Sequence, residues 1–151
     1  MLTFFPHIQF WVDKGYQRLK KFPHNYLPVL GSECYSNENI LELKAFNDRF
    51  ILSLDYSMSE ELGAKRLFSN PDLWPDNIII MILSRVGSDQ GPDVVKLNEF
   101  CRRYPDKLFI AAGGIRNVDD LHAIKLLGVT QALIASSLHS GAIKREDIQN
   151  L

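Results

Sequence analysis

The sequence predicts an α/β protein built on a parallel β-sheet, and two features of its apolar pattern support this fold class. Six short apolar or β-branched runs recur along the 151 residues, and several of the segments between them have helical spacing. The runs are nearly continuous rather than alternating, as expected for strands that a parallel sheet buries on both faces. The expected strands are residues 8–12, 26–30, 50–54, 77–83, 108–112 and 131–134.

The segments between these strands supply the helices. A helix is expected over residues 92–104, because apolar side chains recur there at spacings of three and four and because Pro92-Asp93 suits a helix N-terminus. Its expected inner face consists of Val94, Leu97, Cys101 and Tyr104.

A second helix is expected over residues 117–128. Asn117 suits its N-cap, Asp119 and Asp120 complement the positive end of its dipole, and Gly128 suits the position after its end. A third helix is expected over residues 36–46, where apolar residues gather at Ile40, Leu41 and Leu43.

Composition and charge narrow the class of protein. Hydrophobic residues make up 46% and charged residues 23% of the chain, as in soluble globular proteins. Seventeen basic and eighteen acidic residues give a net charge of −1, which offers no electrostatic case for nucleic acid or an anionic membrane surface.

The N-terminal stretch and the cysteines indicate a cytoplasmic protein. Residues 1–13 are apolar but lack a basic region and are broken by Pro6 and His7, so neither a secretory signal nor a membrane span is expected. Cys34 and Cys101 form no CxxC motif, and a reduced, cytoplasmic chain is the simplest interpretation.

Two adjacent strand ends carry small residues that suit an anion. Ligands of parallel α/β proteins bind at the carboxyl ends of the strands, both in doubly wound sheets and in (β/α) barrels, and the periodicity alone leaves both architectures open. Gly113 and Gly114 follow one strand, and Ser136 and Ser137 follow the next. Bare backbone N–H groups beside hydroxyls can cradle a phosphate. The alternative is a pair of tight turns, because the chain has no GxGxxG or P-loop pattern.

Asp55 is the expected catalytic residue. It ends the buried run over residues 50–54, where partial burial raises a carboxyl pKa toward a value useful for acid–base chemistry. The alternative is an aspartate that caps the following turn. Weaker candidates for substrate contact at other strand ends are Asp13, Arg85, Gly87 and Ser88, and the four histidines show no metal-ligand spacing.

Taken together, these strand ends resemble those of the HisA/HisF family of histidine biosynthesis, whose members are ribulose-phosphate-binding (β/α)₈ barrels. Residues 108–143 are similar to the family's seventh and eighth units, whose two turns hold one substrate phosphate. Residues 50–57 are similar to the fifth strand, whose aspartate is one of two catalytic acids. Gly91-Pro92-Asp93 resembles the Gly-Pro-Asn that opens the sixth helix.

The resemblance extends to the third and fourth units of the family, where the other phosphate binds. Residues 11–17 and 29–33 are similar to these units, which implies phosphate-binding roles for Gly15, Gly31 and Ser32. The sequences of residues 30–33 and 86–93 are most similar to an uncharacterised HisA/HisF-related branch of methanogens and methylotrophs. That likeness implies a link to tetrahydromethanopterin biosynthesis.

The resemblance implies an aldose–ketose isomerisation of the Amadori type on a phosphorylated sugar joined to a nitrogen heterocycle. Asp55 would protonate the ring oxygen, a second aspartate would move the C2 proton, and no metal or redox cofactor would be needed. The second aspartate of the family lies on its first strand, which this chain is expected to lack.

Length adds an expectation about the barrel itself. A complete (β/α)₈ barrel has roughly 200–250 residues, so residues 1–151 are expected to form a single partial barrel domain of about six units, corresponding to units 3–8. Unpaired apolar strands at 9–12 and 131–134 would then favour pairing with another chain. We expect either a truncated reading frame or a homo-oligomer that covers the open side. The non-enzymatic alternative is a subunit that binds a phosphorylated ligand or serves in an assembly.

Overall fold

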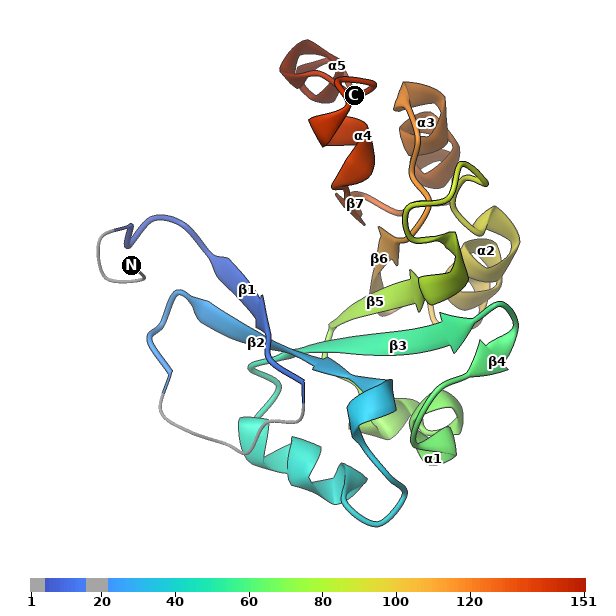
Figure 1. Ribbon diagram of the computed structural model, residues 1–151. Coiled ribbons are helices and arrows are strands. Elements are labelled where there is room, and N and C mark those ends of the chain that lie inside the picture. Colours follow the sequence, from blue (N-terminus) through green and yellow to red (C-terminus); the bar gives the residue numbers. More distant parts are fainter. Residues whose placement is uncertain (1–4, 16–21) are drawn as a thin grey trace.

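The structure is a computed structural model that describes residues 5–15 and 22–151. In this part of the chain, six parallel strands form one curved, open sheet in the order β1-β2-β3-β5-β6-β7 (Figure 1). The expected fold class, an incomplete TIM-type barrel, is therefore confirmed. The strands are β1 (Phe10–Asp13), β2 (Tyr26–Gly31), β3 (Ile51–Ser57), β5 (Asn77–Ile82), β6 (Leu108–Ala112) and β7 (Gln131–Leu133), and the short β4 (Glu60–Glu61) pairs antiparallel with β3. Residues 16 and 17, the end of the segment likened to the third unit, lie outside the described residues.

Helices cover the outside of the curved sheet (Figure 1). The two longest are α2 (Val94–Arg103) and α3 (Val118–Leu126), and shorter ones are α1 (Lys65–Ser69), α4 (Ser136–His139) and α5 (Arg145–Gln149). The described residues also form 3₁₀ helices over Ser32–Cys34, Ile40–Phe46, Pro71–Leu73 and Leu83–Arg85. Of the helices in the described residues, none has the length and apolar character needed to cross a membrane.

Both long helices begin with the caps that the sequence indicates. The Asp93 carboxylate accepts a hydrogen bond of 3.0 Å from the Lys96 backbone N–H, and the Asn117 side chain accepts one of 3.1 Å from the Asp120 N–H. Each cap satisfies a backbone donor that the helix itself leaves without a partner. Gly128 follows α3 with a φ of +86°, as expected for the residue after a helix.

The inner face of α2 differs in part from the expectation. Leu97 and Phe100 are its buried residues, whereas Val94 is 38% exposed. Val94 occupies the first turn of the helix. Cys101 and Tyr104 pack against the core as partly buried residues.

The helix expected over residues 36–46 is present but shorter, and it is a 3₁₀ helix over Ile40–Phe46. Its buried residues, Ile40, Leu43 and Phe46, repeat every three positions, which matches the three residues per turn of a 3₁₀ helix. Leu41, one of the three apolar residues on which the expected helix was based, is 55% exposed. The segment ends at Asn47, whose φ of 47° lies in the left-handed region.

The sheet separates two clusters of buried side chains. On its outer face, strand residues such as Leu52, Leu54 and Ile80 pack with the helices and with Trp74 and Phe100. A smaller cluster lies on the inner face of the curve, and it contains Val29, Ile51, Ile79, Ile110 and Ala112. Each fully buried Leu or Ile contributes roughly 1.5–3 kcal/mol by leaving water. Burial on both faces explains why the strands read as continuous apolar runs.

Candidate functional site

The turn after β6 depends on two consecutive glycines. Gly113 and Gly114 have φ angles of +93° and +84°, in the left-handed region that residues with a Cβ rarely adopt. A Cβ on Gly113 would lie 2.6 Å from the carbonyl oxygen of Ile82, and one on Gly114 would lie 2.5 Å from that of Gly91. The glycine pair therefore lets the β6–α3 turn pack directly against the end of β5 and the loop that follows it.

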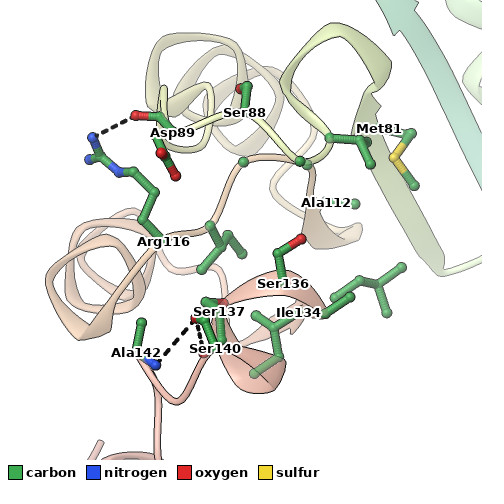
Figure 2. A pocket seen from close by; sticks show the side chains of 17 residues that line it. Met81, Ser88, Asp89, Ala112, Arg116, Ile134, Ser136, Ser137, Ser140 and Ala142 are labelled. Carbon is green, nitrogen blue, oxygen red and sulfur yellow. Dashed lines mark hydrogen bonds between the residues drawn. The ribbon is translucent and has the colours of Figure 1, made fainter.

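A pocket of about 380 Å³ opens beside this turn, at the carboxyl ends of β5, β6 and β7 (Figure 2). Met81, Ala112 and Leu133 line it where the three strands end. They share one row of the sheet, since Met81 pairs with Ala112 and Ala112 with Leu133. Around them lie loop residues: Val86, Gly87, Ser88 and Asp89 after β5, Gly113 to Arg116 after β6, and Ile134 to Ser137, Ser140 and Ala142 after β7.

The serines at the start of α4 give this pocket its hydroxyl groups. The Ser136 side chain is exposed, and Figure 2 shows it pointing into the pocket. Ser137 lines the same pocket with only 4% of its surface exposed, and its hydroxyl finds no hydrogen-bond partner in the described part of the chain. A buried hydroxyl without a partner costs free energy, so a polar ligand atom that reaches Ser137 would gain by pairing with it.

Asp55 lies on the inner face of β3, one strand away from the pocket. It pairs in register with Met81 and therefore belongs to the same row as the strand residues that line the pocket. Asp55 is 5% exposed and is not itself one of the lining residues. Burial raises the pKa of its carboxyl group above the ordinary value.

Three donors surround the Asp55 carboxyl group. The Ser53 hydroxyl donates to Oδ1 at 2.6 Å, and the Ser32 hydroxyl and the Glu33 backbone N–H each donate to Oδ2 at 3.3 Å. The Asp55 N–H in turn donates to the Ser32 hydroxyl at 2.9 Å. These hydrogen bonds favour the ionised carboxylate and oppose the larger effect of burial.

The remaining predicted residues lie outside the lining of the pocket. Gly31 and Ser32 pack around Asp55: Ser32 is fully buried, and a Cβ on Gly31 would lie 2.9 Å from Asp55 Oδ2. At the end of β1, the Gly15 N–H donates to Asp13 Oδ1 at 2.8 Å. The structure thus brings Gly113, Gly114, Ser136, Ser137, Gly87 and Ser88 to one pocket and leaves Asp13, Gly15, Gly31, Ser32 and Arg85 beyond it.

Arg85 binds protein groups in this structure. Its Nη1 donates to the carbonyl oxygens of Gly91 at 2.9 Å and Pro92 at 3.2 Å, and its Nη2 lies 3.6 Å from Asp93 Oδ2. The guanidinium therefore fixes the start of α2. Among residues 5–15 and 22–151, no three His, Cys, Asp or Glu side chains gather as they would around a metal ion.

Arg116 lines the pocket as a cation, and it was not among the site residues predicted from the sequence. Its guanidinium forms two hydrogen bonds with Asp120, of 2.9 Å from Nε and 2.7 Å from Nη2. The available signal was the spacing of four residues between an arginine and an aspartate across a helix N-terminus, a separation at which side chains meet.

The parallel sheet, and the pocket where its last strands end, define a protein of the (β/α) barrel class. Comparison with known proteins shows what the chain is similar to. Residues 72–144 match the family model described as histidine biosynthesis protein. This match confirms the resemblance to the HisA/HisF family that the sequence indicates.

Individual relatives agree with the family model. The chain is 26% identical over 126 residues to the 1-(5-phosphoribosyl)-5-((5-phosphoribosylamino)methylideneamino) imidazole-4-carboxamide isomerase of Thermoanaerobacter pseudethanolicus, covering 75% of this chain and 53% of that enzyme. It is 26% identical over 144 residues to the isomerase of the same name from Caldicellulosiruptor bescii, covering 84% and 59%. An uncharacterised protein of Methanocaldococcus jannaschii is 31% identical over 97 residues, covering 64% and 39%. The chain thus spans about half the length of the first of these relatives.

Proposed function

We propose that this chain forms the phosphate-binding part of a phosphosugar isomerase of the (β/α) barrel type. The observation that carries the proposal is the pocket between the β6–α3 and β7–α4 turns, with the buried, unpartnered hydroxyl of Ser137 in its lining. The small residues Gly113, Gly114 and Ser136 leave room for a phosphate among backbone N–H groups. The names of the two isomerases among the relatives describe a substrate with phosphoribosyl groups, which supports a ligand of the ribulose-phosphate type.

Asp55 is the acid–base residue of the proposal. In an Amadori-type isomerisation the ring oxygen of the sugar takes up a proton as the ring opens, and the C2 proton then leaves to give an enol-like species that becomes the ketose. A carboxyl group whose pKa burial has raised is suited to give the first proton. The ligand would extend from the phosphate at Ser136 and Ser137, past Ala112 and Met81, toward Asp55 along one row of the sheet. A second acid–base group must move the C2 proton.

The binding half of the proposal is tested with inorganic phosphate and ribose 5-phosphate by calorimetry. Ser137→Ala removes a hydroxyl that lacks a partner, so it is expected to leave the free energy of unfolding unchanged or raised while weakening phosphate binding several-fold, by about 1 kcal/mol. Ser59→Ala, at an exposed serine away from the pocket, is the matched control. Equal affinities of wild type and Ser137→Ala would overturn the proposed phosphate site.

A second candidate function, an assembly subunit, is favoured by the edges of the sheet. Within the described residues, β1 pairs only with β2 and β7 only with β6, and edge residues Trp11 and Leu133 are 36% and 38% exposed. Unpaired edge strands invite pairing with another chain. This candidate predicts a homo-oligomer in size-exclusion chromatography with light scattering, and a strictly monomeric chain at high concentration would contradict it.

A pathway proposal follows from the Methanocaldococcus jannaschii relative together with the sequence resemblance to the methanogen and methylotroph branch. We propose that the ligand belongs to tetrahydromethanopterin biosynthesis. Deletion of the gene is then expected to lower the cellular tetrahydromethanopterin pool, and an unchanged pool would contradict this assignment.

A further inference from the structure

Arg116 is held rigidly at the start of α3. Its Nε and Nη2 donate to the two oxygens of Asp120 at 2.9 and 2.7 Å, and its backbone N–H donates to Asp120 Oδ2 at 2.9 Å. Asp120 is 6% exposed. Two parallel bonds between a planar guanidinium and a buried carboxylate fix the orientation of the arginine, because rotation about its last bonds would break both.

The free edge of this guanidinium reaches the loop over residues 86–91, which connects β5 to α2. Arg116 Nη1 donates to the carbonyl oxygen of Asp89 at 3.3 Å, a contact drawn in Figure 2. Gly91 lies directly on the arginine, since a Cβ there would be 2.9 Å from Nη2. On the opposite side of Gly91, its carbonyl oxygen packs on Gly114 and accepts a hydrogen bond from Arg85. Two arginines and the glycine turn thus determine where this loop lies.

The loop forms one wall of the pocket. Val86, Gly87, Ser88 and Asp89 all line it, opposite the residues that follow β7. The end of the loop at Gly91 is fixed by Arg85 and by the cap of α2 at Asp93. At the start of the loop, the Ser88 hydroxyl and backbone N–H donate to the Arg85 carbonyl oxygen at 2.9 and 3.1 Å. The next residue, Asp89, is held through its carbonyl oxygen by Arg116. The position of Asp89 in this wall therefore depends on Arg116.

We propose that Arg116, oriented by Asp120, is a positioning residue that fixes the loop over residues 86–91 against the pocket and thereby sets its affinity for a phosphorylated ligand. The part of this inference that concerns ligand affinity rests on the proposed function. The part that concerns the position of the loop does not. Because the guanidinium is occupied by Asp120 and by the Asp89 carbonyl, Arg116 acts through the loop. A lysine would keep the positive charge but cannot form two parallel bonds to Asp120 while also reaching the loop.

The test compares wild type with Arg116→Lys by two measurements. Calorimetric titration with ribose 5-phosphate is expected to show roughly three- to thirtyfold weaker binding in the variant, the range typical of residues that act on a site without touching its ligand. Amide hydrogen exchange is expected to be faster over residues 86–91 and unchanged in β3 and β5. Lys107→Ala is the matched control, because it removes an ion pair with Asp76 and a bond to the Trp74 carbonyl away from the residues that line the pocket.

The outcomes separate the two proposals. Wild-type affinity and wild-type exchange in Arg116→Lys would overturn the positioning role. Weaker binding with loss of protection throughout the sheet would also overturn it, because the effect would then be general destabilisation. If wild type itself binds neither phosphate nor ribose 5-phosphate, the proposed function fails; the exchange of residues 86–91 then decides alone whether Arg116 positions the loop.

Discussion

The Ser53 hydroxyl donates a hydrogen bond of 2.6 Å to Asp55 Oδ1, two residues further along β3. Both side chains point to the inner face of the curved sheet, because residues two apart on a strand share a face. The polar pair lies toward the carboxyl end of this face: Ile51 precedes it on the same face of β3, and Ile79 lies beside Ser53 on β5. The protonation of Asp55 is thus set by a balance between burial, which disfavours the ion, and donors, which favour it.

Removing the Ser53 hydroxyl is expected to raise the pKa of Asp55 further. Ser53→Ala deletes a donor that stabilises the carboxylate, whereas Ser53→Thr keeps the hydroxyl on a β-branched side chain suited to a strand. The measurement is a ¹³C NMR titration of the Asp55 carboxyl carbon in the three proteins. An identical Asp55 pKa in wild type and Ser53→Ala would show that the short contact has no influence on ionisation.

Asp55 is also expected to make stability depend on pH. Its pKa in the folded protein is raised above the ordinary 3.8, so the folded state binds this proton more tightly than the unfolded chain. Its contribution to the free energy of unfolding is therefore complete below the ordinary pKa and is lost as pH rises through the raised pKa. Urea unfolding between pH 3 and 8 should show that Asp55→Asn abolishes this loss. A wild type and variant whose stabilities differ by a constant amount would contradict the expectation.

The contribution of Asp120 to the free energy of unfolding should have the opposite pH dependence. Hydrogen bonds from the Arg116 side chain hold its pKa below the ordinary value. Its stabilising contribution is then present above the ordinary pKa and is lost as pH falls through the lowered one. Asp120→Asn is expected to flatten the acid limb of the same urea profile, and an acid limb as steep as that of wild type would count against the pairing in solution.

Gly114→Ala is expected to destabilise the fold more than Gly128→Ala. Both glycines have similar positive φ angles, +84° and +86°, so each substitution carries the cost of a left-handed residue, roughly 1–2 kcal/mol. Only at Gly114 does the added Cβ also meet a backbone atom, at 2.5 Å, whereas nothing lies within 4 Å at Gly128. The comparison of their free energies of unfolding isolates this contact. Equal losses would show that the loop does not pack on the turn.

The strands could be predicted from sequence because burial on both faces leaves a continuous apolar run. The expected strand at 108–112 has the observed bounds of β6, and the others differ at their ends by a few residues. For residues 40–46 a helix could be predicted but its 3₁₀ type could not, since a period of three over so few residues resembles the α-helical period of 3.6.

The candidate site could be predicted where the residue type itself determines the backbone conformation, as it does at Gly113 and Gly114. It was not predictable where the role depends on register and packing. The sequence does not show that Ser32 is fully buried and bonded to Asp55, because that contact needs the alignment of β2 with β3. For the same reason the role of Arg116 could not be predicted, because its partners are Asp89 in the loop before α2 and Asp120 in α3.

Phosphate is proposed to bind between the turns that follow β6 and β7, and amide chemical-shift mapping can locate it there. A titration of the ¹⁵N-labelled chain with inorganic phosphate is expected to shift the amide signals of Gly113, Gly114, Ser136 and Ser137 in a saturable manner. The signals of Gly31 and Ser32, packed around Asp55, should stay in place in this titration. Saturable shifts confined to other parts of the chain, or no saturable shift at all, would contradict the proposed phosphate site.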